Sequence, residues 1–130
     1  MNLPAKYNLT LARGKTAVMK FRAKSGDGTA VDLTGLKARC QVRTIDGATG
    51  LSTTTTLLLD LQNGAGIAIT DASAGEVTLS LSSAQTIALC ADNERTSRAY
   101  EIEVYDDSVA PEIVTGFLIG NIHITTEVTR

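Results

Sequence analysis

Tryptophan is missing from this 130-residue sequence, and aromatic residues make up only 4% of it. Domains that recognise carbohydrate commonly present tryptophan or tyrosine rings as flat surfaces on which a sugar stacks. The scarcity of such rings argues against sugar recognition by stacking.

Cysteine and histidine are also scarce. Cys40 and Cys90 could form one disulfide, but a reducing compartment favours two buried free thiols. With His123 they supply three ligands, whereas a structural zinc site needs four. The sequence also lacks a Gly-x-Ser-x-Gly elbow, a glycine-rich phosphate loop and a His-Glu-x-x-His pair. We therefore predict no enzymatic activity and no cofactor.

Long hydrophobic runs and blocks of like charge are lacking too. Even the run 57–59 ends at Asp60, far short of the roughly 18 apolar residues that span a bilayer. Residues 1–6 do not resemble a secretion signal. The net charge is −2, with both signs dispersed, which disfavours binding to nucleic acid or to an acidic membrane. We expect a soluble protein, made in a cytoplasm, that binds neither nucleic acid nor membrane.

The dominant pattern in the sequence is alternation of apolar and polar residues, interrupted by turn residues about every ten positions. The clearest case is the segment 36–43, where Ala38, Cys40 and Val42 share a face. This pattern predicts seven to nine short antiparallel strands in a single domain, residues 1–130. Gly116 and Gly120, in the last strands, predict a bulge or a close approach of two backbones.

One short helix is predicted between two late strands. Ser82 and Gln85 have the spacing of a capping box, in which each side chain satisfies the other's free backbone N–H group, so a helix is expected over 84–89. Tyr100 follows it, and we expect its hydroxyl to pin a corner. The natural packing is an all-β, two-sheet antiparallel sandwich of the immunoglobulin-like kind. Residues 46–56 are expected to be a long Thr-rich loop or β-arm, and 125–130 an exposed segment.

His123 is the single histidine. In the predicted strand, Ile122 and Ile124 take one face, which leaves His123 on the other face beside Asn121 and Thr125. A catalytic base or a metal ligand is one interpretation. A solvated strand position is the favoured one.

A group of carboxylates could in principle hydrolyse a glycosidic bond or hold a calcium ion. Alternation within the group is equally typical of a solvated strand face, and no regular calcium-loop spacing is present, so we favour neither activity. The group consists of Glu101, Glu103, Asp106, Asp107 and Glu112, with Asp71 or Asp92 as further calcium ligands.

A row of basic residues could bind phosphate or the acidic face of a partner. Lys37, Arg39 and Arg43 alternate along one predicted strand, and Lys20 and Arg22 could extend the row. The alternative, which is favoured, is the solvated face of a sheet.

Several of these turn-and-strand motifs together resemble small virion proteins of tailed bacteriophages. The similar group is that of immunoglobulin-like tail and baseplate modules, such as the N-terminal domain of upper-baseplate proteins. The long stretch 46–56 departs from that group, in which a short loop is usual. The motifs are residues 7–16, 27–35, 36–43, 75–82, 99–104, 120–124 and 127–130.

The resemblance implies a non-enzymatic structural protein, a tail, baseplate or fibre-attachment subunit that works through protein–protein interfaces. It implies residence in the virion, assembly in the bacterial cytoplasm, other virion proteins as partners and a homo-oligomer. A capsid decoration protein and a host-surface glycan-binding module are the alternatives. Long, polar segments favour interface residues in the arm and at the C-terminus, namely Asp46, Thr53, Thr54, Thr55, Thr56, Thr129 and Arg130.

Overall fold

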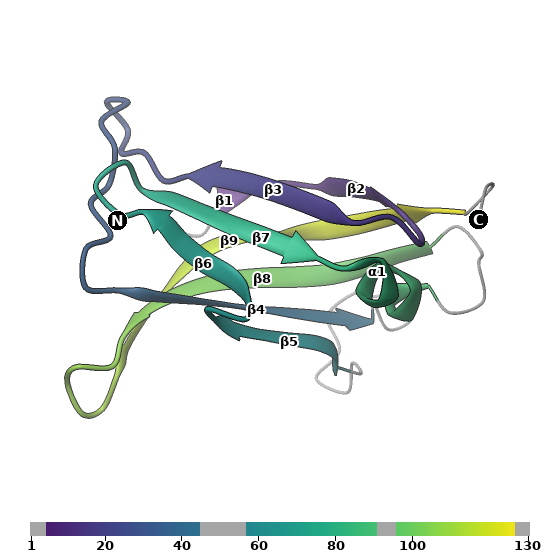
Figure 1. The fold of residues 1–130 in the computed structure, drawn as a ribbon. Coiled ribbons are helices and arrows are strands. Elements are labelled where there is room, and N and C mark those ends of the chain that lie inside the picture. The colour runs from purple at the N-terminus through teal and green to yellow at the C-terminus, as the bar shows by residue number, and fades with distance from the viewer. Residues whose placement is uncertain (1–4, 45–56, 91–95, 127–130) are drawn as a thin grey trace.

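The computed structural model describes residues 5–44, 57–90 and 96–126, and within them nine strands and one helix (Figure 1). In chain order they are β1 (Ala5–Lys6), β2 (Leu9–Ala12), β3 (Ala17–Arg22), β4 (Lys37–Thr44), β5 (Leu57–Asn63), β6 (Gly66–Asp71), β7 (Glu76–Leu81), α1 (Ser83–Leu89), β8 (Thr96–Asp106) and β9 (Ile113–Thr125).

All nine strands belong to one continuous sheet, so the predicted two-sheet sandwich is wrong. The order is β1-β9-β8-β4-β5-β6-β7-β3, with β2 also pairing with β9. β5 is the link that a sandwich would lack, because it pairs with β4 on one side and with β6 on the other. The sheet is also mixed, since β1 and β2 run parallel to β9 and β5 runs parallel to β6.

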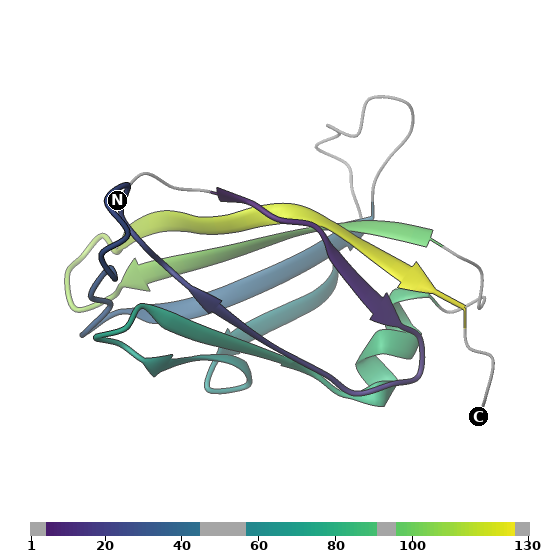
Figure 2. The ribbon, with the colours of Figure 1, turned by 90° about the horizontal axis from the view of Figure 1, so that it is seen from above.

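This sheet curls until its two edges face each other, which gives a barrel that is nearly closed (Figure 2). One edge is formed by β1 and β2, which pair with successive parts of β9 and so act as one strand interrupted at Tyr7 and Asn8. The other edge is β3, which pairs with β7. We call the gap between these two edges the seam.

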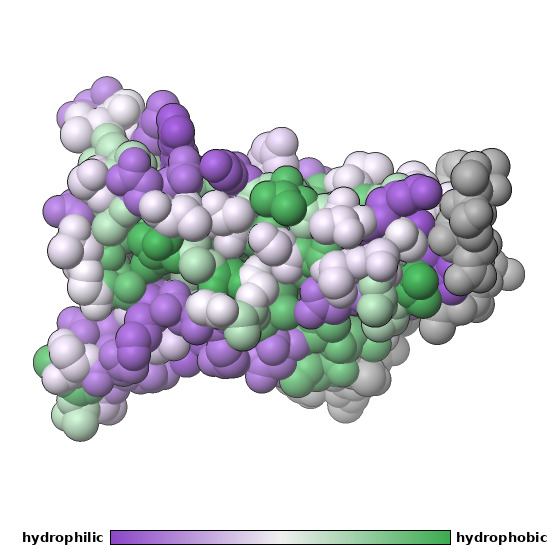
Figure 3. Space-filling model, in the orientation of Figure 1, coloured by the Kyte–Doolittle hydropathy of each residue, from purple (hydrophilic) through white to green (hydrophobic). Residues whose placement is uncertain are grey.

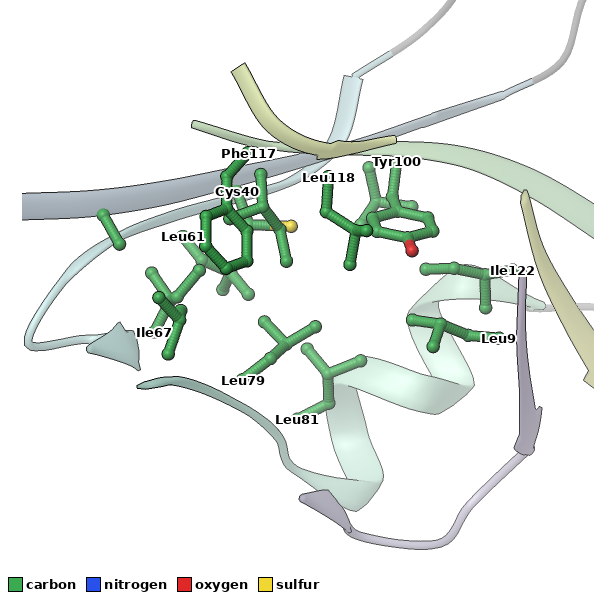
Figure 4. Close-up of a cluster of buried hydrophobic side chains, with 14 of the residues drawn as sticks. Leu9, Cys40, Leu61, Ile67, Leu79, Leu81, Tyr100, Phe117, Leu118 and Ile122 are labelled. Carbon is green, nitrogen blue, oxygen red and sulfur yellow. The ribbon is translucent and has the colours of Figure 1, made fainter. Parts of the chain in front are cut away.

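The core fills the inside of the barrel (Figure 4). The alternation predicted for β4 is confirmed, since Ala38, Cys40 and Val42 are each 0% exposed. Burial raises the pKa of the Cys40 thiol to about 12, so this buried free thiol stays protonated and unreactive at neutral pH. Side chains from opposite walls point toward one another in Figure 4, among them Leu9, Cys40, Leu61, Ile67, Leu79, Leu81, Tyr100, Phe117, Leu118 and Ile122.

Helix α1 lies at the end of the barrel where β7 finishes, and its predicted capping box is confirmed. The Gln85 N–H donates to Ser82 Oγ at 3.2 Å, and the Ser82 N–H donates to Gln85 Oε1 at 2.9 Å. Thr86 and Leu89 face inward and are fully buried. The opposite end is bordered by the loop 24–30 and the β8–β9 hairpin. Figure 3 shows both segments as largely hydrophilic, with apolar surface between them and at the tip of the hairpin.

Both predictions for the glycines of β9 are confirmed. The register of β8 against β9 shifts between Ile102 and Glu103, which leaves Phe117, next to Gly116, as a bulge. Phe117 and Leu118 are consequently both buried, although they are consecutive. At Gly120 a Cβ atom would lie 2.0 Å from the Tyr7 carbonyl oxygen, so a backbone approaches here as predicted.

The Tyr100 hydroxyl has a structural role, as predicted, but it holds an interrupted edge strand and not a corner. It donates to the Tyr7 carbonyl oxygen at 2.5 Å, at the point where β1 gives way to β2. Burial raises the pKa of the Tyr100 hydroxyl to about 12, so it remains a donor. This contact and the Asn121 N–H bond to Asn8 Oδ1, at 3.0 Å, fix the interrupted edge strand to the barrel.

Candidate functional site

The seam originates at the turn between β2 and β3. Consecutive antiparallel strands usually form a hairpin, but β2 and β3 pair with different neighbours, β9 and β7. The backbone bond from the Lys15 N–H to the Ala12 carbonyl oxygen, at 3.2 Å, closes the turn. From there the two strands diverge across the top of the molecule (Figure 2).

Two buried polar residues hold this turn against helix α1. Arg13, only 7% exposed, donates from Nε to the Cys90 carbonyl oxygen at 2.6 Å. Thr86 accepts from the Gly14 N–H at 3.0 Å and donates to the Lys15 carbonyl oxygen at 3.0 Å. A cation at the C-terminal end of a helix also interacts favourably with the helix dipole. These contacts fix the position of the turn from which β2 and β3 diverge.

A groove of 620 Å³ lies along the seam. We call it the seam groove. Its apolar lining comes from both edges and from β9 behind them, namely Tyr7, Leu9, Met19, Phe21, Ala23, Phe117 and Leu118. The rings of Tyr7 and Phe21 meet edge to face across the seam, with centroids 6.3 Å apart. That ring pair bridges the two edges.

Three basic residues line the same groove on its β3 side: Lys20, Arg22 and Lys24. They alternate with Met19 and Phe21, so they point outward while the apolar residues point inward. Arg22 is paired with Glu76 of β7 at 3.1 Å, and its own side chain remains 62% exposed. Two contacts lower the pKa of the Glu76 carboxyl, so it stays ionised at neutral pH. The larger effect comes from the hydrogen bond donated by the Thr70 hydroxyl, and the next from the ion pair with Arg22.

Both walls of the seam are strand edges. Within the described residues, β3 pairs on one side only, and β1 and β2 likewise pair on one side only. An edge strand leaves every second pair of N–H and C=O groups without a partner in the sheet. The seam groove therefore combines open backbone groups, an apolar floor and a basic rim.

The structure separates the residues of the predicted basic row. Lys37 and Arg39 lie on β4, whereas Lys20 and Arg22 lie on β3, with β5, β6 and β7 between them in the sheet. On the β4 side the basic residues meet the predicted carboxylate group. Arg39 contacts Glu103 at 2.9 Å and Glu112 at 3.1 Å, and Lys37 contacts Asp107 at 2.8 Å.

These ion pairs bear on the binding activities considered for the basic row and for the carboxylate group. Lys37 and Arg39 already have anionic partners, and Arg39 also stacks on the Tyr105 ring, 4.6 Å from its centroid. Arg43, farther along β4, donates to the neutral Gln41 Oε1 at 3.2 Å. Glu101 stands apart, because burial, and then the charge of Glu103, raise its carboxyl pKa. On the face formed by β4 and β8, the charges of Lys37 and Arg39 are therefore balanced by neighbouring carboxylates, as is typical of the solvated face of a sheet.

His123 is exposed on β9, and its Nδ1 lies 2.8 Å from Ser97 Oγ, which agrees with the favoured solvated position. Asp71 Oδ1 accepts from the Ser73 hydroxyl at 3.1 Å, within a turn. The side chain of Asp106 likewise closes a turn by accepting from the Ser108 N–H at 2.9 Å. In the described ranges no three His, Cys, Asp or Glu residues gather around a possible metal position.

The predicted interface residues all fall outside the part of the chain that the structure describes. They are Asp46, Thr53 to Thr56, Thr129 and Arg130, and the calcium candidate Asp92 lies outside it too. The sequence interpretation also missed the seam groove. A usable signal was present, since Met19 and Phe21 alternate with Lys20 and Arg22, but alternation cannot reveal that β3 lacks a second neighbour.

Comparison of the sequence with protein-family models and with curated proteins found no match. None of the helical structure in ranges 5–44, 57–90 and 96–126 has the length and hydrophobicity that spanning a membrane requires.

Proposed function

We propose that this protein is a non-enzymatic structural subunit of a tailed-phage virion, in the tail, the baseplate or a fibre attachment, that acts through protein–protein interfaces. The sequence motifs that resemble phage tail and baseplate modules are one source of support. Five of them include parts of β2, β4, β7, β8 and β9, whereas 27–35 lies between β3 and β4 and 127–130 lies outside the described residues.

One structural observation favours an assembly role in particular. Two open strand edges face each other along a groove of 620 Å³ with an apolar lining. Exposed edges are a liability for a protein that works alone, because they template pairing with other chains. In an assembly subunit, the same edges supply backbone hydrogen bonds to a neighbour. We further propose that the subunit repeats around a symmetry axis, as most structural oligomers do.

The test is to label intact particles of the source phage with an antibody raised against this protein and to image them by electron microscopy. Label at the tail or its tip is the expected result. Particles treated with pre-immune serum are the control. Label over the head would replace the proposal with a capsid decoration role. A protein that is abundant in the infected cell but gives no label on any particle would overturn the virion assignment.

A further inference from the structure

We infer that the seam groove accepts an extended segment of a neighbouring virion protein in which apolar residues alternate with acidic ones. The inference rests on the proposed function for the source of the segment. The chemistry of the segment follows from the groove itself, in three steps: its backbone edges, its apolar floor and its charged rim.

The backbone edges call for an extended segment. β3 offers six residues of strand edge, and β1 and β2 form the facing edge. A peptide that enters as a strand can use the N–H and C=O groups of one edge, at the usual strand spacing of about 4.8 Å. Backbone bonds of this kind supply affinity but do not choose a sequence.

The floor calls for apolar residues at every second position. Successive side chains of a strand point to opposite faces, so alternate residues of the segment would enter the groove. There they would contact Met19, Phe21 and Phe117. Met19 and Phe21 are only partly buried, whereas Leu79 and Val77, their partners in register on β7, are 0% exposed. The segment would complete the covering that β3 lacks.

The rim calls for acidic residues at the intervening positions. Lys20 and Arg22 lie at alternate positions on the outer face of β3, next to the open edge, and Lys24 follows two residues after β3 ends. Neither Lys20 nor Lys24 forms an ion pair with any residue that the structure describes. Edge strands commonly carry lysine to discourage unwanted pairing. Because these cations stand on the rim of the groove, on the outer side of β3, they leave the strand edge accessible and select a partner of opposite charge.

The experiment uses the full chain and two fluorescent peptides of about eight residues, matched to the length of the β3 edge. In one peptide valine alternates with glutamate, and in the other valine alternates with lysine. Fluorescence anisotropy measures binding, and hydrogen exchange measures protection of the β3 amides. We expect the glutamate peptide to bind, to slow exchange in residues 17–22, and to bind much more tightly than the lysine peptide.

Two charge reversals locate the site. Lys20→Glu should weaken binding of the glutamate peptide about tenfold, because an attractive cross-strand pair becomes a repulsive one. Lys37→Glu is the matched control, an exposed strand lysine on the β4 face that does not line the groove, and it should change affinity by less than about twofold. Hydrogen exchange of the core strands would show that both variants are folded.

Several outcomes would overturn the inference. They are failure of the folded protein to bind the glutamate peptide, equal binding of both peptides, equal effects of the two reversals, and binding without protection of β3. Binding of a small apolar dye but of neither peptide would instead indicate a small-molecule pocket. A dimer that buries the β3 edge would indicate a second copy as the occupant. If the antibody labels virions while the glutamate peptide fails to bind, the proposed function stands and only this inference falls.

Discussion

β7 and β3 lie side by side in the same sheet, but their inward side chains are covered to different degrees. In β7, Val77, Leu79 and Leu81 are at most 1% exposed. In β3, Ala17, Met19 and Phe21 take the same inward orientation and are directly opposite those residues, yet they are only partly buried. The two strands have similar sequences of alternating residues, so composition does not explain the difference.

The number of neighbours does explain it. β7 is flanked by β6 and β3, so its side chains are enclosed on both sides, whereas β3 borders the seam. Apolar burial stabilises a protein in proportion to the area removed from water, about 25 cal/mol for each Å². The inward side chains of β7 are fully buried, so they already contribute nearly all of this stabilisation. Those of β3 are partly exposed, so an added strand that covered them would contribute more.

The strongest test of this comparison replaces inward residues on the two strands. Leu79→Ala should lower the free energy of unfolding by about 3 kcal/mol, because it leaves a cavity in a fully enclosed site. Met19→Ala, its partner in register, should lower it by only about 1 kcal/mol, since water can reach the space that is left. Urea unfolding with circular dichroism measures both values. Equal losses would mean that in solution β3 is as well covered as β7.

The next test asks whether the edge formed by β1 and β2 is fixed as firmly as the structure indicates. Gly120→Ala would place a Cβ atom 2.0 Å from the Tyr7 carbonyl oxygen, so the edge strand must move away from β9. We expect a loss of about 2 kcal/mol in the free energy of unfolding, and faster hydrogen exchange in residues 9–12.

Gly26→Ala is the matched control for that change. A Cβ atom at Gly26 would meet nothing within 4 Å, so the variant should unfold within about 0.5 kcal/mol of the wild type. If Gly120→Ala were equally harmless, the close approach of the Tyr7 backbone to β9 would be contradicted.

A smaller effect is expected at the turn from which the two edges diverge. Thr86→Val keeps the shape of the side chain but removes a buried hydroxyl that bonds Gly14 and Lys15. The loss should be about 1 kcal/mol, mainly because the Gly14 N–H is left without its acceptor. Thr86→Ser keeps the hydroxyl and serves as the control. Thermal unfolding compares the two variants. A lower melting temperature for Thr86→Ser than for Thr86→Val would show that packing of the methyl group, not the hydrogen bond, holds the turn.

The local features of this fold were predictable from sequence because they depend on neighbouring residues. Ser82 and Gln85 are three positions apart, and the capping box needs nothing else. The alternation of Ala38, Cys40 and Val42 identifies a buried face in the same way. Gly116 and Gly120 indicated irregular backbone, because glycine weakens a strand interior and so usually marks a bulge or a close backbone approach there.

The arrangement of the strands was not predictable in this way. Alternation states which face of a strand is buried, but it does not state which strand lies next to it. The parallel pairing of β2 with β9 joins Leu9 to Ile122, far apart in the sequence, and β5 joins what would otherwise be two sheets. The buried Arg13 was missed for the same reason, since its partner at Cys90 comes from a distant helix end.

The smallest predicted effects concern pH, and they have opposite signs on the two sides of the barrel. On the seam side, the hydrogen bond from Thr70 and then the ion pair with Arg22 lower the pKa of Glu76 below its ordinary value. On the β8 side, burial and Glu103 raise the pKa of Glu101. Glu76 therefore contributes stability that is present above the ordinary pKa and is lost as pH falls through the lowered one. Ionised Glu101 costs stability above its raised pKa, and that cost disappears as pH falls through the ordinary value.

Replacing each carboxyl by its neutral amide separates these two contributions. At pH 7, Glu76→Gln should be less stable than the wild type and Glu101→Gln more stable. Both changes should be small, because Arg22, the partner of Glu76, is 62% exposed and Glu101 is itself exposed. As pH falls toward 3, the free energy of unfolding should decline less for Glu76→Gln and more for Glu101→Gln than for the wild type. The three curves should approach one another at low pH, where glutamine resembles the protonated acid. Urea unfolding across this pH range measures the three curves. If both variants changed the free energy of unfolding in the same direction relative to the wild type, the charged environments of Glu76 and Glu101 would be alike and the comparison would be wrong.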